Sequence, residues 1–238
     1  MFRKSKATEI SEFFALPLEK NEVAVYFLGV SGIIARTNKL TAMFDPTGML
    51  KNDEITALKT LNLLFFTHDH MDHFKAGATK TIVETTSALV VAEDKVANKL
   101  VGKIPAEKLV SAISGKTYIF GEVIVKAIAG IHRGPIMLFH VKMGDVTVFH
   151  GGDSGYVSLT DYPSDVAFVP VGRLSPTASP EKAYKMVMDV KPQVVVTMHG
   201  SDKQKHELES KVTEGMPQTA VLIMKPYTMQ KITLHAKA

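Results

Sequence analysis

Four residues that can bind a metal ion lie within one six-residue segment of the sequence. They are His68, His70, Asp72 and His73, in the order His-Asp-His-Met-Asp-His. Neutral imidazole and carboxylate are the preferred ligands of zinc and of neighbouring divalent ions. Without a cation, so many imidazoles would be costly to place together, because they repel when charged and need hydrogen-bonding partners when buried. The segment therefore predicts a metal site.

Three further candidate ligands follow strand-like apolar segments elsewhere in the chain. His132, Asp153 and His199 each lie a few residues after such a segment, as His68 follows Leu63–Phe66. A rigid strand fixes the position of the loop that follows it, so functional groups collect at strand ends. We expect these residues to complete the site. The remaining histidines, for which we expect core or surface roles, are His140, His150, His206 and His235.

The elements that must position these residues alternate between strands and helices. Strands are expected at residues 23–28, 33–36, 41–45, 63–66, 122–129, 136–142, 146–149, 166–171 and 193–197, with a closing pair at 220–224 and 230–235. Helices are expected at residues 53–61, 94–101, 180–189 and 203–213. If a further helix begins near Asp72, the Asp72 carboxylate and His73 project from its first turn toward the same point. This order predicts two sheet-and-helix halves packed as an α/β layered domain.

Residues 1–22 are predicted to form an N-terminal appendage with a short helix, since Ile10, Phe13 and Phe14 have helical spacing. That helix packs against the main body or supplies a contact in a homo-oligomer. No segment rich in Pro, Gly or Ser divides the rest of the chain. We therefore expect residues 23–238 to form a single domain.

The composition is that of a soluble globular protein, with 45% hydrophobic and 22% charged residues. No apolar run reaches the roughly 18 residues needed to span a bilayer, and no secretory signal is recognisable, so we expect a cytoplasmic protein without a membrane partner. Cysteine is absent, which excludes thiolate ligands and a Cys nucleophile. The net charge of +4 is not concentrated in a basic stripe, so nucleic acid is not an expected partner.

The ligand pattern resembles the metallo-β-lactamase fold superfamily, which has an H-x-H-x-D-H motif, a His about sixty residues later (132 − 73 = 59), a bridging Asp and a final His. Within it, the chain is most similar to the UlaG-like branch of metal-dependent hydrolases. The segments that carry this similarity are Leu28-Gly29-x-Ser31, Phe44-Asp45-Pro46, Gly152-Asp153-Ser154-Gly155, Val169-Pro170-Val171-Gly172, and Lys191-Pro192 leading to Met198-His199. The similarity covers roughly residues 23 to 235. One departure is Val30, which stands where that branch usually has a His.

The resemblance implies a four-layer αββα sandwich that carries a dinuclear metal site. The first ion would be held by His68, His70 and His132, and the second by Asp72, His73 and His199, with Asp153 bridging the two. Zn²⁺ is the first expectation, as one or two ions per chain, with Mn²⁺ and Fe²⁺ as alternatives, because ligand type alone does not choose among them. A His rather than a carboxylate at position 70 resembles the hydrolytic members rather than the oxygen-reducing di-iron members.

Such a site predicts a hydrolase in which a metal-bound hydroxide attacks a small-molecule ester, lactone or phosphoester. Asp72 is the predicted catalytic residue, since it can ligate one ion and orient the nucleophile. The general acid is left open between a metal-bound water and His150. Arg133 and Arg173 lie beside the predicted site in sequence and are candidate contacts to an anionic group of the substrate, with surface salt bridges as the alternative.

Two other functions stay open. One is a metal-dependent nuclease of the same superfamily, although 238 residues leave no room for a large nucleic-acid-binding insertion. The other is a metal-binding sensor that keeps the site without turnover. A serine protease is set aside, because Gly152-Asp153-Ser154-Gly155 is a short match and the chain has neither disulfides nor the all-β strand spacing of that class.

Overall fold

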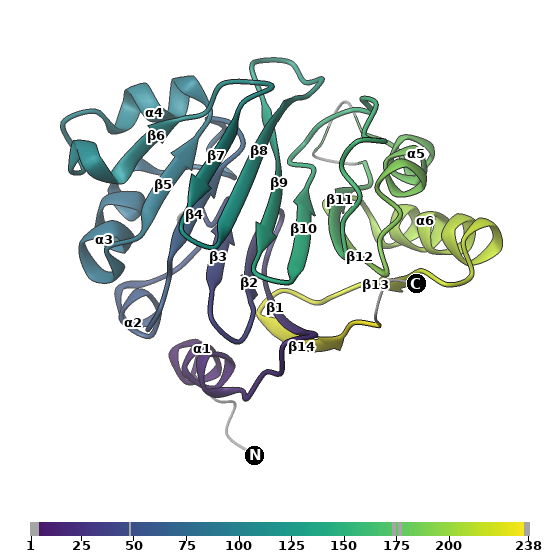
Figure 1. The fold of residues 1–238 in the computed structure, drawn as a ribbon, viewed down its shortest axis with the longest axis horizontal. Helices are drawn as coiled ribbons and strands as arrows, with labels where there is room; N and C mark the ends of the chain where they lie inside the picture. Colours follow the sequence, from purple (N-terminus) through teal and green to yellow (C-terminus); the bar gives the residue numbers. More distant parts are fainter. Residues whose placement is uncertain (1–4, 48, 173–174, 176–177, 236–238) are drawn as a thin grey trace. The chain divides into compact units, whose positions relative to one another are not determined.

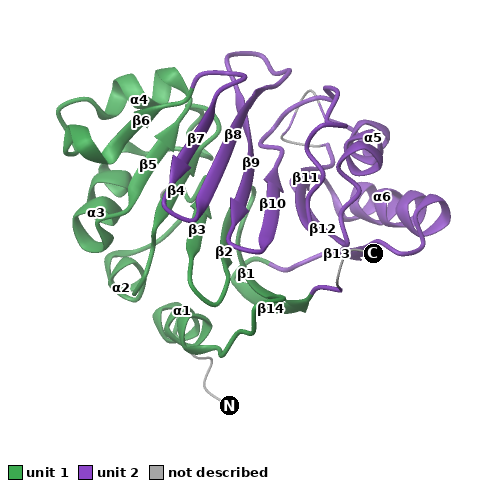
Figure 2. Ribbon diagram, in the orientation of Figure 1, with its two compact units in different colours: residues 1–112, 226–233 green, residues 113–225, 234–238 purple. Residues whose placement is uncertain are grey.

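The computed structural model describes residues 5–47, 49–172, 175 and 178–235, and the chain divides into two compact units (Figure 2). Unit 1 is taken from residues 1–112 and 226–233, and unit 2 from residues 113–225 and 234–238. Each unit contains one seven-stranded sheet. This agrees with the two sheet-and-helix halves expected from the sequence, while the single domain over residues 23–238 stays a prediction.

Unit 1 is built on a sheet with the strand order β14-β1-β2-β3-β4-β5-β6. Its strands are β1 (Glu22–Gly29), β2 (Gly32–Arg36), β3 (Thr41–Phe44), β4 (Leu63–Phe66), β5 (Leu89–Ala92), β6 (Leu109–Ser111) and β14 (Thr228–Thr233). Its helices are α1 (Lys6–Ala15), α2 (Asn52–Thr56), α3 (Ala76–Thr86) and α4 (Asp94–Leu100). Strands β3 to β6 run parallel to one another, so the loops that leave β3 and β4 begin at the same edge of the sheet (Figure 1).

The core of unit 1 lies between this sheet and its helices. Ile10 and Phe13 of α1 are fully buried in it, and the Arg36 guanidinium donates to the carbonyl oxygens of Phe13 and Leu16 at the end of that helix. The predicted appendage therefore contains the expected helix, and this helix packs on unit 1. All four residues of β4 are buried, as their continuous apolar run predicts for a central parallel strand.

Unit 2 is built on a second sheet with the strand order β13-β12-β11-β10-β9-β8-β7. Its strands are β7 (Thr117–Phe120), β8 (Val123–Ala129), β9 (Met137–Met143), β10 (Val146–His150), β11 (Val166–Pro170), β12 (Val194–Met198) and β13 (Ala220–Leu222). Two helices, α5 (Pro180–Val190) and α6 (Asp202–Gly215), pack against this sheet and against each other. Strands β10 to β13 are parallel, so the loops after β10 and β12 also leave from one edge.

Several helices and strands differ from the expectations. Helix α2 ends at Thr56 rather than Leu61. Leu58 and Leu61 are buried, but they anchor a loop to the core rather than form one face of a helix. The last two strands, β13 and β14, do not pair with each other but belong to different sheets. Elements that the sequence did not predict are α3, β5, β6, β7 and the 3₁₀ turn at Ala106–Lys108.

Among the described residues, none of the helices combines the length and the apolar character that crossing a bilayer would require.

Candidate metal centre

The loop that leaves β4 brings three imidazole rings of unit 1 together. The ring centroid of His68 lies 4.5 Å from that of His70 and 4.0 Å from that of His73. His68 and His73 are buried, whereas His70 is exposed. Three imidazoles packed this closely repel one another if they are protonated, so the cluster is suited to neutral rings that share a cation.

The buried carboxylate of Asp45 fixes the protonation of two of these rings. Asp45 accepts hydrogen bonds from the Thr67 hydroxyl at 2.6 Å and from Nδ1 of His73 at 2.9 Å. Because the Thr67 hydroxyl gives its single proton to Asp45, its oxygen accepts from Nδ1 of His68 at 3.0 Å. Both rings thus carry their proton on Nδ1, which is the tautomer in which Nε2 has the lone pair that binds a metal.

Asp72 and His73 lie in a turn, and the helix that follows them, α3, begins only at Ala76. The carbonyl oxygen of His70 accepts from the backbone N–H groups of His73 and Phe74 at 3.0 and 2.9 Å, which closes the turn. The Asp72 carboxylate is 43% exposed and lies 3.8 Å from Nε2 of His73. The turn therefore presents a carboxylate and an imidazole nitrogen to the same point.

A strained loop after β3 holds this turn in place. Thr47 donates its backbone N–H to the carbonyl oxygen of His73 at 2.9 Å and its hydroxyl to that of Met71 at 2.6 Å. Thr47 has a φ of 44° and Asp45 a φ of 42°, in the left-handed region that β-branched residues such as Thr rarely adopt. Strained backbone persists where the surrounding structure holds it, and it is concentrated at functional sites.

Asp69, between the first two histidines, is held by an ion pair with Lys99 of α4. The distance from Lys99 Nζ to Asp69 Oδ2 is 2.6 Å. The hydrogen bond from Lys99, with further attraction from Lys99, Lys95 and His70, lowers the pKa of Asp69. The ion pair ties the loop to α4, so the loop is fixed from a second side.

In unit 2, the loops after β10 and β12 bring Asp153 and His199 into contact. Oδ1 of Asp153 lies 2.5 Å from Nε2 of His199, and both side chains are buried. His199 has a φ of 51°, and Gly200 beside it has a φ of 73°. A Cβ atom at Gly200 would overlap Cγ2 of Val171, so this turn needs glycine at the second position.

Ser154 attaches the loop that carries His132 to the loop that carries Asp153. The Ser154 hydroxyl accepts from the backbone N–H of Ile131 at 2.8 Å and donates to the carbonyl oxygen of Gly155 at 2.7 Å. The backbone N–H of Gly155 in turn donates to the carbonyl oxygen of Ile131 at 2.7 Å. Ser154 therefore has a structural role in the Gly-Asp-Ser-Gly segment, which accounts for its presence without a serine nucleophile.

His150, left open as a general acid, is fully buried, and its Nδ1 atom accepts a hydrogen bond from the backbone N–H of Gly152 at 3.2 Å. An accepting Nδ1 belongs to a neutral ring whose proton is on Nε2. A neutral imidazole is a weak acid, so this geometry favours a structural role for His150.

The structure describes only one of the two arginines that were predicted to contact an anionic group. Arg133 is exposed in the loop that carries His132, whereas Arg173 lies outside the described residues. The candidate anion contact at Arg133 is thus exposed to solvent.

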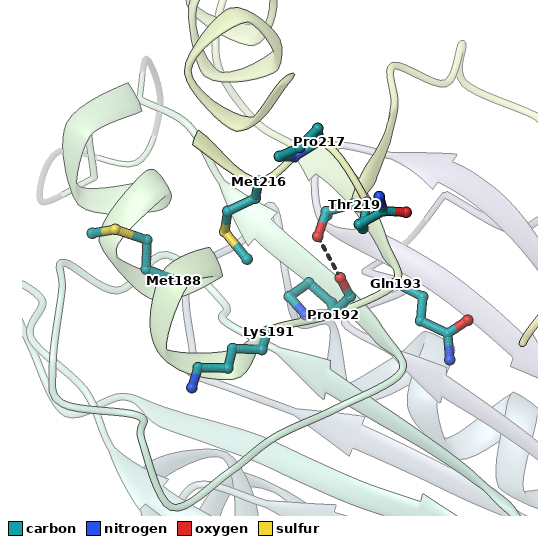
Figure 3. A pocket seen from close by; sticks show the side chains of 8 residues that line it. Met188, Lys191, Pro192, Gln193, Met216, Pro217 and Thr219 are labelled. Carbon is teal, nitrogen blue, oxygen red and sulfur yellow. Dashed lines mark hydrogen bonds between the residues drawn. The ribbon is translucent and has the colours of Figure 1, made fainter. Parts of the chain in front are cut away.

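Unit 2 contains a pocket of about 490 Å³ (Figure 3), at the end of β12 opposite to the end that His199 follows. It is lined by Met188 of α5 and by residues of the segments that follow α5 and α6, among them Pro192, Met216 and Pro217. His199 follows the last residue of β12, whereas Pro192 precedes its first. The pocket contains none of the predicted ligands.

The side chains present fit a divalent metal. Unit 1 brings together His68, His70, Asp72 and His73, and unit 2 brings together Asp153 and His199 and ties the loop of His132 to that of Asp153. These groups are imidazoles and carboxylates, the donor types that zinc and its neighbours prefer.

The sequence did not predict the roles of Asp45, Thr67 and Thr47. From the sequence, Asp45 was recognised only as part of the Phe44-Asp45-Pro46 segment that resembles the family, and no role was predicted for it. It is also the first polar residue after the apolar strand β3, which is the same pattern that identified the ligands. That signal could have found Asp45, whereas the contacts of Thr47 depend on pairing between loops that no local pattern encodes.

Comparison with known proteins supports this description. Residues 24–199 match the family model of the Beta-lactamase superfamily domain. A UPF0173 metal-dependent hydrolase of Thermococcus kodakarensis is 32% identical over 74% of this chain and 84% of its own length. A UPF0173 metal-dependent hydrolase of Caldivirga maquilingensis is 29% identical over 77% of this chain and 87% of its own length.

Two solved structures share the fold. Igni18, a metallo hydrolase from Ignicoccus hospitalis, has a TM-score of 0.73 at 20% identity and covers 89% of this chain and 98% of its own. The metallo-beta-lactamase fold protein YhfI from Bacillus subtilis has a TM-score of 0.70 at 13% identity and covers 88% of this chain and 99% of its own. The α/β fold of the metallo-β-lactamase type expected from the sequence is confirmed, while the finer assignment to the UlaG-like branch stays a prediction. The chain belongs to the beta-lactamase superfamily and, within it, to the UPF0173 family of metal-dependent hydrolases.

Proposed function

We propose that the chain hydrolyses a small-molecule ester, lactone or phosphoester at a centre of one or two divalent ions, with Zn²⁺ as the first candidate and Mn²⁺ or Fe²⁺ as alternatives. One ion is held by His68, His70 and His132 and the other by Asp72, His73 and His199, with Asp153 bridging the two. Membership of a family of metal-dependent hydrolases supports this assignment.

One observation carries the proposal: three imidazoles and a carboxylate lie together on a loop whose histidines are prepared as ligands. Asp45 sets the tautomer of His73 directly and that of His68 through Thr67. A carboxylate that orients a ligating imidazole also raises its basicity and hence its affinity for metal. A structural role alone would not explain why both rings have Nδ1 protonated.

The ions, when bound, lower the pKa of water toward neutrality and polarise the substrate oxygen that they contact. The protein's own groups position the reaction. Asp72 is half exposed and 3.8 Å from Nε2 of His73, so its carboxylate can both ligate and accept a hydrogen bond from an attacking water. Asp153 and His199 are a buried pair in unit 2. As proposed ligands, they would supply negative charge that offsets the charge of the ions.

The first test is metal content. Protein purified without chelator should contain one to two equivalents of a transition metal by mass spectrometry, and His70→Ala should lose metal and hydrolysis together. His206→Ala is the matched control, because His206 lies on the surface of α6 in an ion pair with Glu209. Metal-free protein that keeps full activity would contradict the proposal.

The second test is a substrate panel of lactones, thioesters, phosphodiesters and RNA. Turnover of a lactone, an ester or a phosphoester small molecule supports the proposal. Turnover of RNA alone would replace it with a nuclease. Bound metal without turnover of any substrate would point to a metal-binding sensor.

We further propose that Arg133 and Arg173 contact an anionic group of the substrate, since guanidinium forms paired hydrogen bonds with phosphate and carboxylate. Arg133→Glu and Arg173→Glu should each raise KM for phosphorylated substrates more than KM for neutral esters. Equal effects on both substrate classes would reject the contact.

A further inference from the structure

Strand β7 forms one edge of the unit 2 sheet and presents an exposed isoleucine there. Among the described residues, β7 pairs with β8 alone (Figure 1). The side chain of Ile119, inside β7, is 70% exposed, and the other exposed large apolar side chains in the described part of the chain lie outside the strands. Sheet edges usually carry charged residues or proline, because an apolar edge can pair with a strand of another chain. The sequence of β7, Thr-Tyr-Ile-Phe, contains neither.

The backbone at Ile119 is directed away from β8. The N–H of Ala127 in β8 donates to the carbonyl oxygen of Lys116 at 3.1 Å, and the Ala127 carbonyl oxygen accepts from the residue before Lys116 at 2.8 Å. Backbone groups point to opposite sides at successive residues of a strand, so Val125, two residues before Ala127, also bonds toward β7. Val125 stands opposite Tyr118. Ile119 follows Tyr118, so its N–H and carbonyl oxygen point away from the sheet, where a further strand can bind them.

We propose that this edge binds the same edge of a second copy of the chain, with the two β7 strands antiparallel and Ile119 at the twofold axis. The inference does not depend on the proposed metal centre. In this register the two Ile119 residues exchange both backbone hydrogen bonds, and Thr117 lies opposite Gly121 of the second copy. The two isoleucine side chains meet on the exposed face of the sheet. Apolar cross-strand pairs of this kind stabilise a sheet.

Charge complementarity selects this register. Lys116 and Glu122 lie three residues before and three residues after Ile119, and both are exposed. Pairing about Ile119 therefore brings Lys116 of each copy opposite Glu122 of the other, which forms two ion pairs. A twofold axis at Tyr118 would instead set Lys116 opposite Phe120, with no charge pair. Opposite charges across paired strands are stabilising and like charges are destabilising, so the sequence of this edge fits a second copy of itself.

The first test is the mass of the protein in solution. One pair of short strands is a small interface, so the dimer should be weak. Sedimentation equilibrium should show a mass near 26.0 kDa at about 5 µM protein, rising toward twice this value at about 500 µM. Ile119→Lys should raise the Kd of the dimer by at least about tenfold, because two like charges then meet at the axis. The matched control is Met188→Lys, which replaces a 40% exposed apolar side chain of α5 and should leave this Kd unchanged.

Exchange of charges tests the register. Lys116→Glu and Glu122→Lys should each weaken self-association by about tenfold, because like charges then face each other at both ends of the pairing. An equimolar mixture of these two variants should dimerise as the unmodified protein does, since the charges are again opposite across the axis. Lys80→Glu and Glu84→Lys make the same changes in net charge on α3 and should leave self-association unchanged.

Hydrogen exchange tests the backbone contact. The amide of Ile119 should become protected as the protein concentration rises, whereas that of Phe120, which bonds toward β8, should be protected at every concentration. Exchange at Ile119 that does not depend on concentration would overturn the proposal. Protein that stays monomeric throughout would also overturn it, and the edge would then be open to a strand of a different protein. A dimer that persists in Ile119→Lys would place the interface elsewhere. Charge variants that fail to restore dimerisation in the mixture would reject the twofold register and the proposal with it.

Discussion

Nδ1 of His73 lies 2.9 Å from Oδ2 of Asp45, and both side chains are fully buried. The same carboxylate accepts the backbone N–H and the hydroxyl of Thr67, whose oxygen contacts His68. One carboxylate thus orients two imidazoles that stand five positions apart in the chain. Orientation of ligands by such outer groups is worth about 10- to 100-fold in metal affinity.

Asp45→Asn should therefore weaken metal binding without removing a ligand. The asparagine amide has a single acceptor oxygen, and its NH₂ group cannot accept the protons of His73 and Thr67. We expect a Kd for Zn²⁺ about 10- to 100-fold higher than that of the unmodified protein, measured by competition with a chromogenic chelator.

The matched control for this variant is Asp189→Asn. Asp189 also accepts a hydroxyl and a backbone N–H, from Tyr156 and Leu159, but it lies on α5 of unit 2. Asp189→Asn should lower the free energy of unfolding and leave the Kd for Zn²⁺ unchanged. If Asp45→Asn and Asp189→Asn have the same Kd, the orienting role of Asp45 is wrong.

Two glycines on either side of His132 give a second prediction. A Cβ atom at Gly130 would lie 2.6 Å from the Ser154 hydroxyl oxygen and 2.8 Å from Cγ2 of Ile136, whereas a Cβ at Gly134 would meet nothing within 4 Å. Gly130→Ala should lower the free energy of unfolding by about 1–3 kcal/mol through overpacking. Gly134→Ala should change it by less than about 0.5 kcal/mol.

Urea unfolding monitored by circular dichroism measures both variants. The difference between them isolates the contacts with Ser154 and Ile136, because both substitutions add one methyl group to the same loop. Equal stability of the two variants would mean that the loop shifts to accept the methyl group at Gly130.

The sequence predicted the strands that carry the ligands because their pattern is local. Val194–Met198 is mostly β-branched and Leu63–Phe66 is continuously apolar, and short runs of these kinds between turn residues predict buried strands. Helix α3 was missed because its segment, Ala76–Thr86, contains several threonines and only two large apolar residues, so it has little helical periodicity. The pairing of β14 with β1 joins residues about two hundred positions apart, and no local pattern encodes it.

The candidate site likewise combines features that a local sequence pattern predicts with features that depend on contacts between distant segments. The ligands on the 68–73 segment could be predicted from residue type and spacing, since four such donors within six residues are costly to bring together unless a cation binds them. Whether a helix begins at Asp72 was left open, and a turn closed on the His70 carbonyl is what brings Asp72 and His73 together. The support from Thr47 and Ser154 could not be predicted, because each hydroxyl contacts a loop that is distant in sequence.

A third prediction concerns acid stability through Glu22 and Lys231, which connect β1 to β14. The hydrogen bond from Lys231, at 3.0 Å, is the largest of the effects that lower the pKa of Glu22 below its ordinary value of 4.5. A lowered folded-state pKa stabilises the fold above the unfolded-state pKa, and this contribution is lost as the pH falls through the folded-state pKa. Lys231→Gln should therefore be less stable than the unmodified protein at pH 7 and equal to it at acid pH well below 4.5.

Urea midpoints at both pH values test this expectation. Lys80→Gln is the control, because Lys80 forms only a long surface pair with Glu84 at 3.6 Å, and such pairs contribute little. A destabilisation by Lys231→Gln that is the same at both pH values would assign its effect to lost packing instead of the ion pair.

The fourth prediction concerns Val30, the position at which the chain departs from the UlaG-like pattern. Val30 has a φ of 55°, and the next residue, Ser31, lies 3.0 Å from Nδ1 of His73 through its hydroxyl. A β-branched residue in the left-handed region is strained, while His adopts that region more readily. Val30→His should thus raise the free energy of unfolding by about 1 kcal/mol, the lower end of such strain. Val101→His, at an exposed position with a φ of −52°, should leave it unchanged. If Val30→His is instead less stable than Val101→His, packing of the valine side chain stabilises the turn by more than the backbone strain at Val30 destabilises it.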